Sequence, residues 1–241
     1  MAELVYKQII TDLKNKIFAG EFADMKLPDE RSLSEHYQVS RSSIKRALSK
    51  MAREGIIFKK RGSGTFINPL YLQSESVFNY EEGSNLGVSD NFKLNGKKPQ
   101  TKVLSFKVIS PNDTLRKNLF LAPGEFVYKI KRLRLFDNQP FMIETGYIPI
   151  KILPQLTHDH LESSIFKYVQ TTLKQTASKS FMSISAEPST MEDQALLKLK
   201  PNEPTSVMEG IFFLDNGTPF EFSSMRLHYK FAKFNTFIDI N

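Results

Sequence analysis

Apolar residues in the first part of the chain recur every three or four positions, which places them on one face of an α-helix. One set with this spacing predicts a first helix over residues 4–18: Tyr6, Ile9, Ile10, Leu13 and Ile17. Gly20 follows, and glycine commonly ends a helix. The chain therefore begins with an amphipathic helix whose apolar face needs a partner.

Two shorter helices are predicted next. Asp29, which follows a proline, is a good N-cap for a helix that buries Leu33 and Tyr37. Ser40 is a natural N-cap for another helix over residues 41–53. The apolar stripe of this helix consists of Ile44, Ala47, Leu48 and Met51. Its free face is basic and rich in hydroxyl groups: Arg41, Ser42, Lys45, Arg46, Ser49, Lys50 and Arg53.

A β-hairpin is predicted after these helices. Residues 56–60 and 65–67 are strand-like, and the turn Arg61-Gly62-Ser63-Gly64 between them is basic and contains glycine. Two helices joined by a tight turn and followed by such a hairpin form the pattern of a winged helix-turn-helix. A basic helix face alone is commonly just a solvated surface. The turn and the hairpin together favour DNA binding.

The same stretch resembles the winged helix-turn-helix of GntR-type bacterial repressors. Its matching motifs are Tyr6, Leu27-Pro28-Asp29-Glu30-Arg31, Val39-Ser40-Arg41-Ser42-Ser43-Ile44-Lys45 and Gly62-Ser63-Gly64-Thr65. Asp29 replaces the usual serine, and Lys45 replaces the usual arginine and lacks its planar fork. The resemblance implies DNA contacts at Arg31, Arg41, Lys45 and Gly62. The full set of candidate DNA-binding residues is Arg31, Arg41, Ser42, Ser43, Lys45, Arg46, Arg61 and Gly62.

The second half of the chain has the alternating pattern of β-strands. Six strands are predicted, over residues 101–109, 126–136, 141–148, 180–187, 205–214 and 219–227. Residues 137–140 and 215–218 are hairpin turns, and the second contains Asn-Gly. Helices are expected at 111–119, 160–170 and 189–197, with a further helix start at residues 89–91. This pattern predicts an α+β domain around an antiparallel sheet.

The organisation expected is a DNA-binding domain over residues 1–69, a linker over 70–87 and an effector-binding and dimerisation domain over 88–241. The charge distribution agrees with this division. Residues 1–70 hold 13 Lys and Arg against 8 Asp and Glu, a net charge of +5 within the +7 of the whole chain. Basic charge thus concentrates where phosphate contacts are expected.

Composition excludes several kinds of chemistry. The chain has no cysteine, so disulfides, thiolate catalysis and thiolate metal sites are excluded. His158 and His160 lie in an expected loop and are interpreted as a solvated pair, so no metal or cofactor is expected. There is no signal peptide and no apolar run of about 20 residues. We expect a cytoplasmic protein without a membrane partner.

Paired arginines are the candidate chemistry of the second domain. Arg132 and Arg134 share one face of a strand because side chains alternate along it. The following hairpin can bring Glu144 close to them. Either a structural Arg–Glu pair or a pocket for a small anion fits these residue types. Ser89, at a helix start, could add backbone N–H groups for a phosphate, although most such serines are simple N-caps.

Residues 88–234 resemble the UTRA effector domain of HutC-type members of the GntR family, whose fold is similar to chorismate lyase. The motifs are Ser89-Asp90-Asn91-Phe92, Gly96-Lys97-Lys98-Pro99, Lys131-Arg132-Leu133-Arg134, Pro140, Ile143-Glu144-Thr145, Tyr147-Ile148-Pro149, Leu161 with Ile165-Phe166, and Pro219-Phe220-Glu221. The resemblance implies phosphate binding at Ser89, Arg132 and Arg134. It implies sugar-hydroxyl binding at Glu144, Ser164, Phe166 and Glu221, where Phe166 replaces the family's usual tyrosine and loses one hydroxyl contact.

These features together predict a transcriptional regulator that is not an enzyme. We expect a repressor that binds palindromic operator DNA as a homodimer and leaves it when a small anionic effector, a sugar phosphate, binds. One alternative is the same DNA-binding role with a non-sugar carboxylate effector. A remote alternative is a chorismate lyase-like enzyme, against which the sequence shows no nucleophile–base pair.

Overall fold

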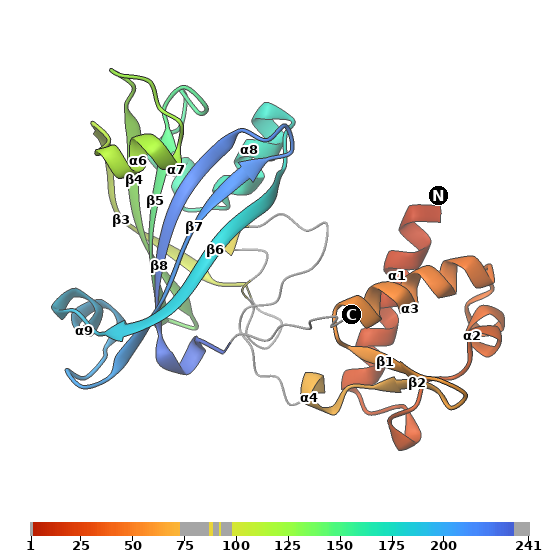
Figure 1. Cartoon of the computed structure of the whole chain (residues 1–241). Helices are drawn as coiled ribbons and strands as arrows, with labels where there is room; N and C mark the ends of the chain where they lie inside the picture. The colour runs from red at the N-terminus through yellow and green to blue at the C-terminus, as the bar shows by residue number, and fades with distance from the viewer. Residues whose placement is uncertain (1, 73–86, 89–91, 93–97, 234–241) are drawn as a thin grey trace. The chain divides into compact units, whose positions relative to one another are not determined.

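The computed structural model describes residues 2–72, 87–88, 92 and 98–233 (Figure 1). Contacts divide the chain into two compact units, one formed mainly by residues 1–75 and the other by residues 76–234. The expected helix start at residues 89–91 lies outside the described residues. Each unit has its own apolar core, and each is described separately below.

The N-terminal unit includes the three helices and the hairpin that the sequence predicts. Its main elements are α1 (Ala2–Phe18), α2 (Glu30–Tyr37), α3 (Arg41–Arg53), β1 (Ile57–Lys60) and β2 (Gly64–Ile67). The apolar stripes of α1 and α3 meet in the core, where Leu13, Ile44 and Leu48 are fully buried. The two strands are antiparallel, with Lys60 opposite Gly64.

Side-chain caps set the two helix starts that define the helix-turn-helix. Asp29 Oδ1 accepts hydrogen bonds from the backbone N–H groups of Arg31 and Ser32, at 2.9 and 2.8 Å. Ser40 Oγ accepts one from Ser43 N at 3.2 Å. Gln38, at the end of α2, is left-handed with φ of 53° and allows the sharp turn between the helices. Both caps are the residues that the sequence predicts.

A short helix occupies the start of the expected linker. α4 runs from Pro69 to Leu72, and Tyr71 and Leu72 pack against the core of the N-terminal unit. Asn68 Oδ1 accepts a hydrogen bond from Leu70 N at 3.1 Å, while its amide donates to Gly55 O at 2.8 Å. The linker expected over residues 70–87 stays a prediction, but its first residues form a helix because Asn68 acts as a cap and the half-buried Tyr71 and Leu72 pack against the core.

The second unit is built on a six-stranded antiparallel sheet in the order β3-β4-β5-β8-β7-β6. The strands are β3 (Gln100–Ile109), β4 (Val127–Phe136), β5 (Gln139–Pro149), β6 (Ala177–Pro188), β7 (Pro204–Leu214) and β8 (Pro219–His228). All six predicted strands are present. β5 begins at Gln139, inside the predicted turn, because Asp137 and Asn138 alone make the turn with positive φ.

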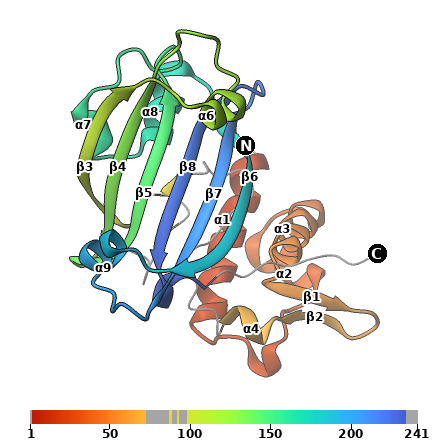
Figure 2. The same ribbon diagram turned by 60° about the vertical axis from the view of Figure 1, so that its left-hand side comes forward.

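Helices cover both faces of this sheet. α7 (His158–Leu161) and α8 (Ile165–Leu173) pack on one face, whereas α6 (Asp113–Asn118) and α9 (Met191–Leu197) pack on the other, from whose side Figure 2 is viewed. The two faces differ in the residues that they bury, because the sheet separates one large apolar cluster under α7 and α8 from two smaller clusters, one under α6 and one under α9. The strand residues of the large cluster share their face with Arg132 and Glu144.

The single helix predicted at 160–170 is wrong, because Ser164 caps a new helix by accepting a hydrogen bond from Lys167 N. The loop expected around His158 and His160 is also wrong, since both residues belong to α7. His160 Nδ1 contacts the Thr157 hydroxyl at 2.9 Å, and its ring stacks on Tyr168 with the ring centroids 4.0 Å apart. His160 thus has a structural role at the start of a helix. No group of three potential metal-binding side chains occurs within the described residues.

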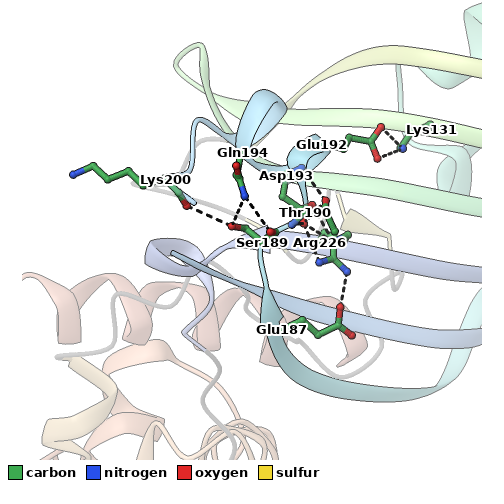
Figure 3. A network of polar contacts seen from close by, with 9 residues as sticks. All are labelled: Lys131, Glu187, Ser189, Thr190, Glu192, Asp193, Gln194, Lys200 and Arg226. Atoms are coloured by element: carbon green, nitrogen blue, oxygen red, sulfur yellow. Dashed lines mark hydrogen bonds and ion pairs between the residues drawn. The ribbon is translucent and has the colours of Figure 1, made fainter. Parts of the chain in front are cut away.

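A charged network fixes α9 to the sheet (Figure 3). Arg226 of β8 donates from Nε to both carboxylate oxygens of Asp193, at 2.9 and 3.0 Å, and from Nη1 to Glu187 of β6 at 2.8 Å. Burial alone would raise the pKa of Asp193, but hydrogen bonds led by that from Arg226 lower it below the usual value. Lys131 of β4 pairs with Glu192 of the same helix. The network joins α9 to three strands.

Candidate DNA interface and effector site

The exposed face of α3 begins with a group of hydroxyls and cations. Arg41, Ser42 and Lys45 are exposed. Ser40 Oγ lies 2.8 Å from Ser42 Oγ and 2.9 Å from Ser43 Oγ, so three hydroxyls meet at the first turn. The face carries no acidic residue in its first turn. Such a surface suits a DNA backbone and base edges, because it offers donors and positive charge.

Two other candidate arginines contact side chains of their own unit. The guanidinium carbon of Arg46 lies 4.1 Å from the centre of the Tyr6 ring, a cation–π contact between α3 and α1. Arg31 Nε donates to Glu35 at 2.9 Å on the exposed side of α2. The Arg31 pair is well exposed and therefore weak, so DNA phosphate can compete for it. Arg46, by contrast, contributes to packing between helices.

The hairpin, which we call the wing (residues 57–67), is tied to the first turn of α2. Lys59 Nζ donates to Glu30 at 2.8 Å. Gly62 and Gly64 have φ of 73° and 117°, which disfavours other residues. A Cβ on Gly64 would lie 2.9 Å from Lys26 Cε, whereas one on Gly62 would meet nothing within 4 Å. Gly62 and exposed Arg61 therefore present an open tip.

A groove of about 830 Å³ lies between the wing and the segment that joins α1 to α2. Its lining includes four acidic and four basic side chains: Glu21, Asp24, Asp29, Glu30, Lys26, Lys59, Lys60 and Arg61. Because the two signs are balanced, the groove has no net attraction for an anion. The groove is therefore a poor candidate for the site of an anionic effector.

Gly62→Val is expected to weaken operator binding at least tenfold while leaving effector binding unchanged. Valine is strained at positive φ and adds bulk at the tip that approaches DNA. Gly62→Asn is the matched variant, because asparagine tolerates this conformation but still adds a side chain. Anisotropy titrations of labelled operator measure both. If both variants bind like the wild type, the wing tip does not approach DNA.

The second unit buries a group of four charged side chains, here called the charge cluster: Arg132 and Arg134 on β4, Glu144 on β5 and Glu221 on β8. Arg132 Nη2 donates to Glu144 Oε1 at 2.9 Å, and Arg134 Nη1 lies 3.6 Å from Glu144 Oε2. Arg132 and Glu144 are opposite each other in the ladder. The sequence prediction that Glu144 lies near both arginines therefore agrees with the observed geometry.

Backbone carbonyls complete the surroundings of Arg132. Its Nη1 donates to Leu161 O and Ser163 O, both at 3.3 Å. These carbonyls lie between α7 and α8, so the break between the two helices positions the guanidinium. Sequence analysis missed both partners because backbone carbonyls leave no signal in residue type. Burial lowers the pKa of Arg134 to about 10, against the effect of Glu144, and this side chain stays charged near neutral pH.

Glu221 completes the charge cluster in a different way. It is 1% exposed, and its Oε2 has no hydrogen-bond partner among the described residues. Burial raises the pKa of this carboxyl to about 8, and the negative charge of Glu144 adds to the effect while Arg132 opposes it. Its other oxygen lies over Gly146, where any Cβ would overlap with it. Residue type and spacing did not predict that Glu221 lacks a cationic partner.

The remaining effector candidates lie at the start of α8. Ser164 caps the helix, and Phe166 is buried with its ring edge-on to Phe212 and Phe220, at 5.2 and 5.1 Å between centroids. Phe166 is therefore part of the core. A Cβ on Gly87 would lie 3.1 Å from Phe166 Cβ and 3.5 Å from Ser164 Oγ, which places residue 87 beside α8.

Ser89 lies outside the described residues, and Val88 and Phe92 are the described residues nearest to it in the sequence. Val88 and Phe92 are buried in the core that α7 and α8 share with the sheet, and Phe92 packs against Phe141 with ring centroids 6.0 Å apart. This is the face of the sheet that carries the charge cluster.

Comparison with known proteins agrees with both halves of this description. The UTRA domain family matches residues 94–231, and the family of bacterial regulatory proteins, gntR family, matches residues 5–67. The HTH-type transcriptional regulator GmuR of Bacillus subtilis is 33% identical over 229 residues, which are 94% of this chain and 95% of GmuR. The mannosyl-D-glycerate transport/metabolism system repressor MngR of Escherichia coli is 27% identical over 95% of this chain and 94% of its own.

A solved structure shows the same arrangement within each unit. The crystal structure of the possible transcriptional regulator YydK from Bacillus subtilis superposes with a TM-score of 0.78, at 26% identity, over 98% of this chain and 99% of YydK. No helix in the described part of the chain is long and apolar enough to span a membrane. The chain belongs to the GntR family of bacterial regulatory proteins and, with its UTRA domain, is a transcriptional regulator.

Proposed function

We propose that this regulator is a repressor that binds palindromic operator DNA as a homodimer and releases it when a phosphorylated sugar binds beside the charge cluster. In this proposal residues 1–69 read DNA, and residues 88–241 bind the effector and a second copy. One winged helix reads only a half-site, so a two-fold pair is needed to read a palindrome. The effector acts by binding the DNA-free conformation more tightly than the DNA-bound one.

The observation that carries the proposal is the surplus of buried hydrogen-bonding atoms in the charge cluster. Arg132 Nε, Glu144 Oε2 and Glu221 Oε2 are buried without a hydrogen-bond partner among the described residues. A buried polar atom without a partner costs free energy, and such atoms in a folded protein call for an explanation. A polar ligand that supplies partners to several of them is the simplest explanation.

The charge of the cluster supports an anionic ligand. Arg132 and Arg134 are both cationic, whereas Glu144 is the carboxylate that pairs with them. With Glu221 neutral, the cluster holds one net positive charge in a buried setting. Arginine forks are well matched to phosphate and carboxylate oxygens. Ser89 lies outside the described residues, and it stays in the proposal as a phosphate contact that the sequence resemblance implies.

A sugar is proposed on the basis of the relatives. MngR is, by its name, a repressor of a mannosyl-D-glycerate system. Mannosyl-D-glycerate joins a sugar to a carboxylate. A sugar effector could therefore carry either a phosphate or a carboxylate as its anionic group. The competing proposal is a non-sugar carboxylate effector, which the paired arginines could hold as well. The two proposals differ in whether the phosphate and the sugar hydroxyls are both needed.

A thermal-shift screen separates these proposals. Full-length protein is heated with phosphorylated hexoses and disaccharides, with the same sugars lacking phosphate, and with small carboxylates including mannosyl-D-glycerate. We expect stabilisation by a phosphorylated sugar and none by its unphosphorylated counterpart at equal concentration. Stabilisation by a carboxylate alone would support the competing proposal. Each compound that stabilises the protein is then titrated into complexes with operator selected from random duplexes.

A further inference from the structure

Glu221 is surrounded by groups that leave its carboxyl without a counter-ion. Its register partner on β7 is Phe212, and the aromatic rings of Phe166 and Phe220 pack nearby. The charged groups that act on it are Glu144 on the neighbouring strand β5 and Arg132 on β4, one strand further along the sheet. Of these, Arg132 already donates to Glu144, so the cation that acts on Glu221 is engaged by the other carboxylate.

A buried carboxylate is stable only when it is paired or hydrogen-bonded, and otherwise it takes up a proton. Glu221 has neither kind of partner among the described residues, and a second carboxylate lies in the same cluster. Two carboxylates that share a site seldom both ionise. Glu144 accepts the arginine hydrogen bond, so Glu221 is the carboxyl that keeps the proton.

We propose, building on the proposed function, that Glu221 carries a proton when no effector is bound and meets the effector as a hydrogen-bond donor. The carboxyl then recognises an oxygen acceptor of the ligand, such as a phosphate, ring or carbonyl oxygen. A carboxylate at this position would instead accept hydrogen bonds from sugar hydroxyls and would cancel the remaining positive charge of the cluster. The protonated carboxyl therefore favours ligands that present a hydrogen-bond acceptor at this position, and it preserves the positive charge that attracts an anion.

The proton can be observed without any ligand. Infrared spectra of full-length wild-type protein and Glu221→Gln are compared at pH 7. Glutamine keeps the size of the side chain and a neutral donor. The difference spectrum is expected to show the carbonyl band of one protonated carboxylic acid, and this band should fade as the pH is raised to 9. Carboxylate bands in the difference spectrum at pH 7 would overturn the proposal.

Effector binding supplies the second measurement, with glucose 6-phosphate as the probe. With a pKa of about 8 for Glu221, about one tenth of the wild type keeps the proton at pH 9, so affinity should fall about tenfold between pH 7 and pH 9. The phosphate itself is largely dianionic at both values. Glu221→Gln should keep its affinity across this range, and Glu221→Ala should bind weakly throughout. Equal pH dependence in wild type and Glu221→Gln would overturn the assignment of the proton to Glu221.

The two proposals fail in distinguishable ways. If glucose 6-phosphate and the other phosphorylated sugars bind none of these proteins at pH 7, the proposed effector class is wrong, but the infrared band still decides whether Glu221 is protonated. If the sugar phosphate binds and the infrared difference shows a carboxylate, the effector class stands and the protonated donor is excluded.

Discussion

An Arg134→Met variant is expected to stay on its operator at effector concentrations that release the wild type. Arg134 is 1% exposed and lies beside Glu144, on the face of the sheet that carries Arg132. Methionine fills much of the same volume but removes the positive charge and the fork of donors. The DNA-reading helices belong to the other unit and are not altered. In a cell this variant would appear permanently repressed.

Two other substitutions at Arg134 distinguish the effect of its charge on the effector response from its effect on the stability of the fold. Removal of a buried ion-pair partner costs about 3–5 kcal/mol of unfolding free energy in both Arg134→Met and Arg134→Ala, and the alanine variant adds to this loss a cavity that methionine largely fills. That loss is a large part of a typical domain's stability, which makes alanine a poor test of function. Arg134→Lys should rescue the response only partly, because an ammonium lacks the planar fork.

Lys131→Met is the matched control for Arg134→Met. It removes one positive charge from the same strand, but Lys131 points to the opposite face and pairs with Glu192. Its response to the effector should match that of the wild type. If Arg134→Met and Lys131→Met respond alike, Arg134 does not hold the effector. If Arg134→Met cannot bind operator even without effector, Arg134 has a structural role.

Arg41→Ala is expected to abolish specific operator binding without changing the response of the second unit to its effector. Arg41 is exposed at the first turn of α3, next to the Ser40 cap. Loss of a bidentate base contact costs about 1–3 kcal/mol, and in a dimer it is lost at both half-sites. Operator affinity should therefore fall by about thirtyfold or more, while affinity for unrelated duplex changes far less.

Arg53→Ala serves as the control for Arg41→Ala, since it removes the same charge from the last turn of the same helix. We expect it to lower affinity for all duplexes equally and to change the salt dependence of binding. Competition between operator and scrambled duplex measures the difference. If Arg41→Ala prefers operator over scrambled duplex as strongly as the wild type does, α3 does not dock through its first turn.

The sequence predicted most of the fold because local patterns dominate it. Asp29 and Ser40 are caps whose chemistry acts within three residues, and the strands follow a period of two. The errors occur where a single side chain changes a boundary. Asn68 starts an unexpected helix, and Ser164 divides the helix predicted at 160–170 into two. Both residues cap through side-chain oxygens, and several other serines and asparagines in the chain do not.

The candidate site could be predicted from the sequence only where a hairpin between consecutive strands brings its residues together. A hairpin between β4 and β5 brings Glu144 opposite Arg132, so residue spacing was sufficient. β8 joins β5 from far along the chain, and only the folded sheet shows that Glu221 reaches the cluster without a partner. In the same way, Arg46 was expected on the DNA face, and the contact with Tyr6 depends on how α1 crosses α3.

The most direct test of the account is release of operator by a phosphorylated sugar, measured by fluorescence anisotropy with wild type, Arg134→Met and Lys131→Met. We expect wild type and Lys131→Met to leave the operator as the sugar phosphate is titrated. The unphosphorylated sugar should have no effect, and Arg134→Met should stay bound. Release of the wild type by the unphosphorylated sugar, or release of Arg134→Met at the wild-type concentration, would contradict this account.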